Sequence, residues 1–228
     1  MNVKKKVAEY AVVHTVKSEY RIGLGSGSTA LYCVASLARL LRKGTLKNLK
    51  VAASSLETLA ACYEEKLPVY PLDYPGFIEP FDVVIDGADE IDTQGYLIKG
   101  GGGAHVMEKI IAEHSKQFIV IADSSKLVDV LGNRTSVPVE VIPSAYRLII
   151  RRLNMLGGNP ILRAAQKKLG PVITEQGNVI IDVRFAGIED PPELSRMLHS
   201  IPGVVDHGIF VIPSQKFIIF PNGNIVSK

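Results

Sequence analysis

The sequence lacks the features that mark several protein classes. Among its 228 residues there are only two cysteines, Cys33 and Cys62, and they form no C-x-x-C pair. Both fall in stretches with helical character, so we expect buried, reduced thiols and neither a disulfide nor a metal site. No apolar run reaches the roughly 18 residues of a membrane span, and no apolar signal core follows the N-terminal lysines. We therefore expect a soluble, cytoplasmic protein without a membrane partner.

A concentrated charge of one sign is also lacking. The 26 basic and 23 acidic residues leave a net charge of +3, and basic residues cluster only at Lys4-Lys5-Lys6, which we interpret as a solvated helix face. This distribution does not favour nucleic-acid binding. With 46% hydrophobic and 21% charged residues, the chain can bury a sizeable core. Its length suits one large domain or two of modest size.

The first chemically informative stretch is a strand, loop and helix unit around residues 20–41. Its loop reads Gly25-Ser26-Gly27-Ser28-Thr29-Ala30, which suits an anion at a helix N-terminus. A dinucleotide-binding unit would end its second strand in an acidic residue, but residues 49–53 are followed by Ser54-Ser55. The lysine of a Walker A loop is missing too. We therefore expect Ser26, Gly27, Ser28 and Thr29 to bind a single phosphate group.

A buried parallel strand is predicted at residues 81–85 because this stretch is short, apolar and β-branched. It runs into Asp86-Gly87-Ala88-Asp89-Glu90-Ile91-Asp92, with four carboxylates in seven residues. Loops after parallel strands are where open α/β sheets bind ligands. This loop could hold a divalent metal, supply an acid or base, or be a solvated turn, and no histidine lies near it in sequence.

Four consecutive glycines follow Lys99 and precede a predicted helix that begins near Ala104. Gly100 to Gly103 allow the backbone to approach a ligand closely, and the helix N-terminus attracts an anion. Glu108 lies about one turn into this helix and is a candidate base, although it could simply stabilise the first turn. After a further buried strand at 117–122, Lys126 either faces the same ligand or is a solvated lysine behind a helix cap.

The pattern changes after residue 132. Residues 138–142, 145–156, 160–164, 179–183, 192–200 and 204–212 read as strand, helix, strand, strand, helix and strand, with 172–174 extending the second strand. This is the order of a ferredoxin-like domain. The predicted fold class is α/β, with a Rossmann-like, largely parallel sheet domain (1–132 plus 207–228) and a smaller ferredoxin-like α+β domain (133–206).

The candidate residues suit proton abstraction beside the carbonyl of a small sugar phosphate. Glycines and hydroxyls would bind the phosphate, a carboxylate would move the proton, and a lysine would stabilise the enediolate oxygen. Two alternatives remain at this point: a sugar-phosphate sensor, for which the chain has no helix-turn-helix before Ile22, and an amino-sugar phosphate deaminase or acyl-CoA transferase.

In this combination of motifs the sequence resembles the A-type ribose-5-phosphate isomerase family. The motifs are Gly25 to Ala30, Asp86 to Glu90, Lys99 to Ala104, Glu108-Lys109-Ile110, Ala122 to Lys126, Pro138 to Val141 and Ile201 to Val205. The resemblance implies interconversion of D-ribose 5-phosphate and D-ribulose 5-phosphate in the non-oxidative pentose phosphate pathway. It also implies a homodimer or homotetramer and no metal or organic cofactor.

The family's functional residues carry over by position. Glu108 matches the base, Lys99 the oxyanion-stabilising lysine, and Asp86 and Asp89 the aspartates that assist ring opening and hold sugar hydroxyls. The substrate contacts implied are Ser26 to Thr29, Asp86, Gly87, Ala88, Asp89, Lys99, Gly100, Gly101, Gly102 and Lys126. The chain departs from the family at Ser26, often a threonine, and at His105-Val106-Met107, often Leu-Thr-Arg, which removes an arginine beside the base. We interpret His105 as a structural or capping residue.

Overall fold

The computed structural model describes residues 2–227, which group into two compact units with separate cores. Unit 1 comprises the residues up to Gly87, Met107–Ser125 and the residues from Ile212 on. Unit 2 comprises Ala88–Val106 and Lys126–Val211. The domain boundaries expected from the sequence, at residues 132 and 207, stay a prediction. No helix within residues 2–227 has both the length and the apolarity to cross a bilayer.

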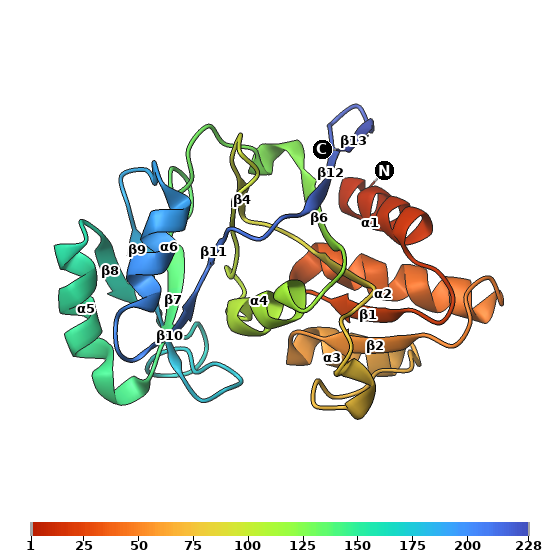
Figure 1. The fold of residues 1–228 in the computed structure, drawn as a ribbon, viewed down its shortest axis with the longest axis horizontal. Coiled ribbons are helices and arrows are strands. Elements are labelled where there is room, and N and C mark those ends of the chain that lie inside the picture. Colours follow the sequence, from red (N-terminus) through yellow and green to blue (C-terminus); the bar gives the residue numbers. More distant parts are fainter. Residues whose placement is uncertain (1, 228) are drawn as a thin grey trace. The chain divides into compact units, whose positions relative to one another are not determined.

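Unit 1 is built on a six-stranded sheet, as predicted from its short apolar stretches. Its strands are β1 (Arg21–Leu24), β2 (Lys50–Ala53), β3 (Val83–Asp86), β6 (Phe118–Asp123), β12 (Gln215–Ile219) and β13 (Ile225–Ser227). They lie in the order β13-β12-β6-β3-β1-β2, and all of these strands except β3 are labelled in Figure 1. Every pair is parallel except β12 with β13. The Rossmann-like, largely parallel sheet is thus confirmed.

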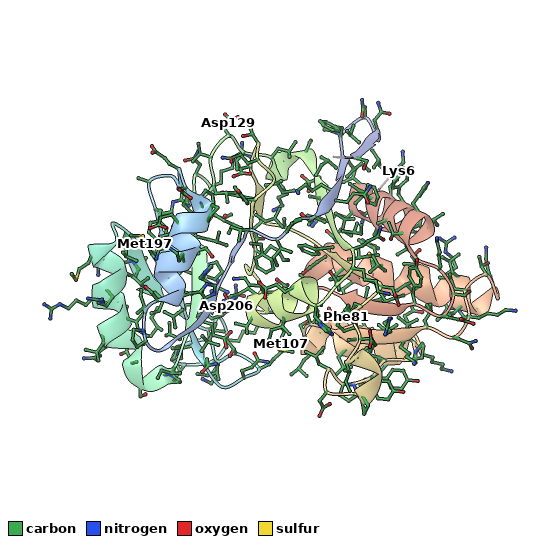
Figure 2. All side chains as sticks on the ribbon, viewed as in Figure 1. Lys6, Phe81, Met107, Asp129, Met197 and Asp206 are labelled. Carbon is green, nitrogen blue, oxygen red and sulfur yellow. The ribbon has the colours of Figure 1, made fainter. Side chains whose placement is uncertain are left out.

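Two of the helices of unit 1, α1 (Val3–Thr15) and α3 (Leu56–Glu64), begin at polar side chains that cap them. The unit also contains α2 (Gly27–Arg42) and most of α4 (His105–Glu113), with a 3₁₀ turn at Pro75–Phe77. Asn2 accepts hydrogen bonds from the first N–H groups of α1, and Ser55 caps α3 through Thr58. Phe81, labelled in Figure 2, is fully buried, and its ring centroid lies 4.8 Å from that of Phe77.

Asp82 joins three parts of unit 1 just before β3. One carboxylate oxygen accepts the Arg21 N–H at 2.8 Å, and the other accepts the Lys116 ammonium at 2.7 Å. Burial alone would raise the pKa of this carboxyl, but the hydrogen bonds from Lys116 and Arg21 outweigh it and lower the pKa to about 2. Asp82 therefore stabilises the fold mainly in its ionised form.

Unit 2 contains the predicted ferredoxin-like arrangement. Its elements are β7 (Val137–Val141), α5 (Tyr146–Met155), β8 (Asn159–Leu162), β9 (Val179–Arg184), α6 (Pro191–His199) and β10 (Val204–His207), with a 3₁₀ turn at Pro143–Ala145. The strands lie antiparallel in the order β10-β7-β9-β8. This is the order that a split βαβ chain produces, so the smaller ferredoxin-like sheet is confirmed.

Glu140 is a fully buried carboxyl in the centre of this sheet, on β7. One of its oxygens accepts hydrogen bonds from Thr174 at 2.9 Å and from Asn178 at 2.8 Å. Burial raises the pKa of Glu140, these two hydrogen bonds oppose the shift, and the charges of Asp206 and Glu175 add to it. The proton of Glu140 is therefore held more tightly in the folded protein than in the unfolded chain.

A small three-stranded sheet in unit 2 differs from the sequence prediction. It consists of β4 (Glu90–Ile91), β5 (Leu97–Ile98) and β11 (Ile209–Phe210) in the order β11-β5-β4. The single strand predicted over residues 204–212 is in fact two, β10 and β11, which belong to different sheets. Gly208 lies between them, and its lack of a side chain allows the close packing there, since a Cβ would lie 2.2 Å from the Lys99 carbonyl oxygen.

Candidate active site

The loop after β1 brings Ser26 to Glu108 within unit 1. Gly25 fixes the start of the loop, since its N–H donates to the Ile85 carbonyl at 3.0 Å and its carbonyl accepts the Thr58 hydroxyl at 2.8 Å. Ser26 occupies the N-cap position of α2 but does not cap the helix with its side chain. Its hydroxyl instead donates to a carboxylate oxygen of Glu108.

Glu108 lies in the first turn of α4, as the sequence predicts, and only 3% of its surface is exposed. The carboxylate is therefore largely shielded from bulk water and held by a neutral donor. Such surroundings suit a group that takes and returns a proton, because a hydroxyl can follow the carboxylate through both protonation states. The sequence did not indicate the contact between Ser26 and Glu108, since 82 residues separate them.

Asp86 ends β3 and is fully buried in unit 1. One carboxylate oxygen accepts the N–H of Gly87 at 2.7 Å. A Cβ on Gly25 would lie only 1.8 Å from the carboxyl carbon of Asp86, so the absence of a side chain at Gly25 is what makes room for this carboxylate. Gly25, the first glycine of the loop, therefore provides the space that the Asp86 carboxylate occupies.

The remainder of this loop combines a glycine of positive φ with a contact from a lysine that the sequence did not single out. Gly27 has a φ of +79°, a conformation that favours glycine. The Lys4 ammonium, from α1, donates to the Ser28 hydroxyl at 2.8 Å. We expected Lys4 to Lys6 to form a solvated helix face, but Lys4 makes this contact and Lys6 donates to the Gly223 carbonyl at 2.6 Å. Lys4 thus places a positive charge beside the predicted phosphate loop.

The hairpin of β4 and β5 positions Asp89 and Lys99 within unit 2. The Asp89 N–H donates to the Ile98 carbonyl at 2.8 Å, and the Lys99 N–H donates to the Gly208 carbonyl at 2.9 Å. Both residues therefore lie at the same end of the three-stranded sheet. Lys99 is only 3% exposed, and its ammonium lies 5.3 Å from the centroid of the Phe210 ring. The aromatic face partly compensates for the water that the buried ammonium has lost.

The glycines that follow Lys99 form a turn in contact with Asp89. The Gly103 N–H donates to the Gly100 carbonyl at 2.9 Å, and the Gly101 N–H donates to the Asp89 carboxylate at 2.8 Å. Gly100 has a φ of +97°, and a Cβ there would lie 2.6 Å from that of His105. His105 is fully buried, which agrees with the structural role expected for it.

The remaining predicted contacts are less constrained. Gly87, Ala88 and Lys126 are half-buried, and Gly102 is exposed. Lys126 ends a 3₁₀ turn that begins at Ser124, and its side chain has no recorded hydrogen bond or ion pair to another described residue. Its ammonium is thus available to an anionic ligand.

Two of the carboxylates in the Asp86 to Asp92 segment have structural partners. Glu90, 1% exposed, accepts the backbone N–H groups of Gly132, Arg134 and Thr135 at 2.6–2.7 Å. Asp92 accepts the Tyr96 N–H at 2.8 Å. Through these hydrogen bonds Glu90 and Asp92 stabilise loops of unit 2. Asp86 and Asp89 therefore remain the candidate catalytic carboxylates of this segment.

One group spaced closely enough to share a metal ion occurs within residues 2–227, and it lies elsewhere, at His199, Asp206 and His207. His199 is 3.0 Å from the Asp206 carboxylate. Both ring nitrogens of His207 are already engaged, Nδ1 with the Ile209 N–H at 3.2 Å and Nε2 with the Ser195 carbonyl at 3.1 Å. Because both of its ring nitrogens have hydrogen-bond partners, His207 is not a candidate metal ligand.

Neither the cysteines nor a surface depression of unit 1 adds a candidate residue to the site. Burial and the charge of Asp86 raise the pKa of the Cys33 thiol, and burial raises that of Cys62 to about 11, so neither is a ready nucleophile.

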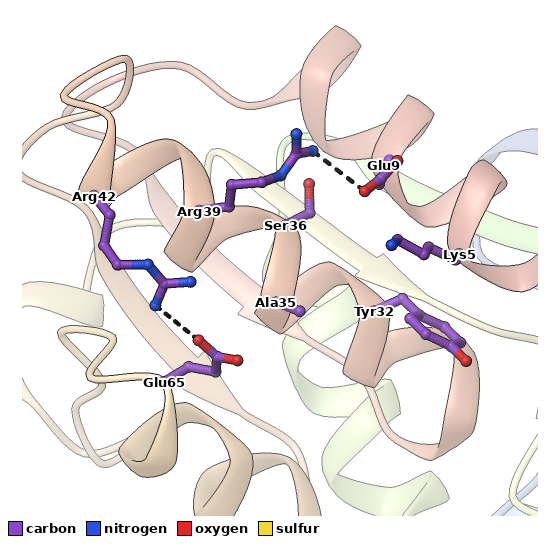
Figure 3. A pocket seen from close by; sticks show the side chains of 8 residues that line it. All are labelled: Lys5, Glu9, Tyr32, Ala35, Ser36, Arg39, Arg42 and Glu65. Atoms are coloured by element: carbon purple, nitrogen blue, oxygen red, sulfur yellow. Dashed lines mark hydrogen bonds and ion pairs between the residues drawn. The ribbon is translucent and has the colours of Figure 1, made fainter.

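A depression of about 170 Å³ lies across α1 and α2 (Figure 3). Four of its five charged residues form ion pairs, Arg39 with Glu9 and Arg42 with Glu65, and no predicted site residue lines it.

Residues 50–223 match the family model described as ribose 5-phosphate isomerase A (phosphoriboisomerase A). Ribose-5-phosphate isomerase A of Trichodesmium erythraeum is 44% identical over 209 residues, which cover 92% of this chain and 86% of the relative.

Two solved structures extend the match over the whole fold. Ribose 5-phosphate isomerase A of Methanocaldococcus jannaschii superposes with a TM-score of 0.93 at 41% identity, covering 100% of this chain and 98% of the other. A D-ribose-5-phosphate isomerase in complex with phospho-erythronic acid gives a TM-score of 0.95 at 38% identity, covering 100% and 99%. On sequence and fold together, the chain belongs to the ribose 5-phosphate isomerase A family.

Proposed function

We propose that this aldose–ketose isomerase interconverts D-ribose 5-phosphate and D-ribulose 5-phosphate by moving one proton between C2 and C1, with Glu108 as the base. The observation that carries the proposal is the buried Glu108 carboxylate at the start of α4, held by the Ser26 hydroxyl. Family membership supports the substrate and the reaction type, and no metal or organic cofactor enters any step.

The reaction begins on the open-chain aldose. Glu108 removes the proton from C2, the released electron pair forms a C1–C2 double bond, and the carbonyl π electrons move onto O1. Glu108 then returns the proton to C1 while the proton of the O2 hydroxyl passes to O1, so that O2 becomes the ketose carbonyl oxygen and O1 a hydroxyl. One carboxylate on one face of the substrate can serve both transfers, which agrees with a single base in the first turn of α4.

Lys99 is the group proposed to stabilise the negative charge on the enediolate oxygen. An ammonium that is already partly desolvated interacts strongly with a charge that develops in the transition state. Asp86 and Asp89 are proposed to assist ring opening and to bind the sugar hydroxyls.

The phosphate end is assigned to the loop after β1. Gly27, Ser28 and Thr29 offer backbone N–H groups and hydroxyls at the start of α2, and Lys4 adds a positive charge beside Ser28. Ser26 belongs to the same loop and additionally orients Glu108. Gly87, Ala88, Gly100 to Gly102 and Lys126 complete the proposed substrate contacts.

The experiment is to measure ketose formation from ribose 5-phosphate with a strong chelator present. Glu108→Gln should lower kcat by about 10²- to 10⁴-fold, as expected on removing a general base. The matched control is Glu113→Gln, the same substitution at an exposed position on the same helix, which should keep the wild-type rate. Activity lost to the chelator in the wild type, or retained in Glu108→Gln, would contradict the mechanism.

Phospho-erythronic acid, bound in one solved relative, offers a second test. Its carboxylate resembles the enediolate, so it should inhibit this chain competitively and bind more weakly to Lys99→Met. Equal inhibition of the wild type and Lys99→Met would contradict the role of Lys99.

The proposal also includes assembly into a homodimer or homotetramer and a cytoplasmic location. Family membership supports a homo-oligomer, and the two buried, unbridged cysteines agree with a reducing compartment. Light scattering across a concentration series would distinguish a monomer, a dimer and a tetramer.

A further inference from the structure

Arg163 is a firmly held side chain of unit 2 to which the sequence analysis gave no role. It directly follows β8, and its N–H donates to the Ile180 carbonyl at 2.8 Å while its carbonyl accepts the Val172 N–H at 2.9 Å. The main chain at Arg163 is therefore fixed on both sides.

The guanidinium is oriented as firmly as the backbone. Nε and Nη2 donate to the two carboxylate oxygens of Asp182, on β9, at 2.8 and 2.6 Å. This two-point pairing fixes the plane of the group, because guanidinium and carboxylate are both planar. The remaining nitrogen, Nη1, points to the glycine turn and lies 3.2 Å from the carbonyl oxygens of both Gly100 and Gly101.

These contacts hold one peptide group from opposite sides. In a trans peptide the C=O and the N–H point in opposite directions. The carbonyl of Gly100 accepts Arg163, and the N–H of the same peptide, on Gly101, donates to the Asp89 carboxylate at 2.8 Å. Glycines on both sides make rotation of this peptide sterically easy, so an external clamp is needed to keep its orientation.

We propose that Arg163 is a positioning residue for the isomerase reaction, clamping the peptide between Gly100 and Gly101 so that it directs Asp89. Lys99 directly precedes Gly100, so the clamp also limits the motion of the lysine backbone on its C-terminal side. The inference rests on the proposed function for its effect on catalysis, but the clamp itself can be tested without any activity.

Three variants test the proposal. Arg163→Met removes the clamp, and Arg163→Lys keeps the charge but cannot pair with Asp182 at two points while reaching both carbonyls. Arg184→Met is the matched control, because Arg184, at the end of β9, also donates to two loop carbonyls, those of Arg134 at 2.7 Å and Asn133 at 3.0 Å. It lies in the same unit but has no recorded contact with the glycine turn.

The first readout is amide hydrogen exchange at Gly101. Exchange should accelerate at least about tenfold in Arg163→Met, less in Arg163→Lys, and not at all in Arg184→Met. Unchanged exchange at Gly101 in both Arg163 variants would overturn the clamp, whether or not the protein is an isomerase. Since Arg163→Lys is the milder change, it keeps the test available if Arg163→Met does not fold.

The second readout is the separation of kcat from KM. A misplacement near 1 Å can cost about 10²-fold in rate, so Arg163→Met should lower kcat by about 10- to 100-fold. KM should change by only about threefold, because the phosphate loop of unit 1 is untouched. Wild-type kcat in Arg163→Met, alongside an inactive Glu108→Gln, would refute the inference and leave the proposed function intact. Inactivity of the wild type would refute the proposed function instead, and Gly101 exchange would then decide on the clamp.

Discussion

Gly25→Ala should disable the enzyme by displacing Asp86 while leaving most of the fold in place. A Cβ at Gly25 would lie 1.8 Å from both the carboxyl carbon and one oxygen of Asp86. The carboxylate would have to move by about 1.6 Å to reach the 3.4 Å at which ordinary contacts begin. Asp86 is fully buried at the end of a central strand, so no solvent-filled space is open to it.

The size of the effect follows from this displacement. A shift of more than 1 Å in a positioned group is expected to cost about 10²-fold or more in kcat/KM. Overpacking of a buried position typically costs about 1–3 kcal/mol of unfolding free energy. The backbone is not strained by the substitution, because Gly25 is not among the glycines with positive φ.

Steady-state isomerisation and urea unfolding of the same preparations would measure both quantities. The control is Gly44→Ala, where φ is +71° and a Cβ meets nothing within 4 Å. That variant should lose about 1–2 kcal/mol to backbone strain and keep its kcat/KM. A Gly25→Ala protein whose kcat/KM lies within a factor of a few of the wild type would refute the link between this glycine and Asp86.

Three further outcomes concern ionisable groups. Asp82→Asn should lower the free energy of unfolding by about 2 kcal/mol at pH 7, because the pKa of Asp82 is about 2 in the folded protein and ordinarily 3.8. This contribution is present above pH 3.8 and lost as the pH falls towards 2, so a loss of equal size at pH 2 in urea unfolding would contradict it. Glu140 has a raised pKa, so its contribution is complete below the unfolded pKa of about 4.3 and is lost as the pH rises through the folded value. Glu140→Gln should therefore flatten the rise of unfolding free energy on going from pH 7 to pH 4, and an unchanged pH profile would count against this account. Cys33 and Cys62 should react slowly with a thiol reagent at pH 8 until the protein is unfolded, and immediate labelling of the native protein would show that the thiols are accessible.

Most of the longer strands and helices could be predicted because the sequence patterns that indicate them lie within the elements themselves. The apolar stretches that became β3 and β6 lie within a residue or two of their predicted positions, and the order of elements after residue 132 gave the ferredoxin-like sheet. Glu108 was placed in the first turn of its helix from four glycines and a run of helix formers.

What the sequence could not supply depends on contacts between distant residues. The two-residue strands β4, β5 and β11 are too short to show any periodicity, although they position Lys99 and Asp89. Glu90 looked like one more acid in a cluster until its three backbone donors, more than 40 residues away, were known. Arg163 and Lys4 are likewise identified only by the groups that they reach.

The strand pair β12 and β13 has a consequence for the order in which the chain matures. β12 lies in the unit 1 sheet between β6 and β13, yet both strands come from the last stretch of the sequence, after Ile212. During synthesis β1, β2 and β3 leave the ribosome long before β12, which must pair with β6 across about 90 residues of intervening chain. The residues of the ferredoxin-like sheet are contiguous and can fold first. The nascent unit 1 sheet therefore has β6 as an exposed edge strand until β12 has been synthesised, and an unpaired edge strand can pair with another chain and aggregate.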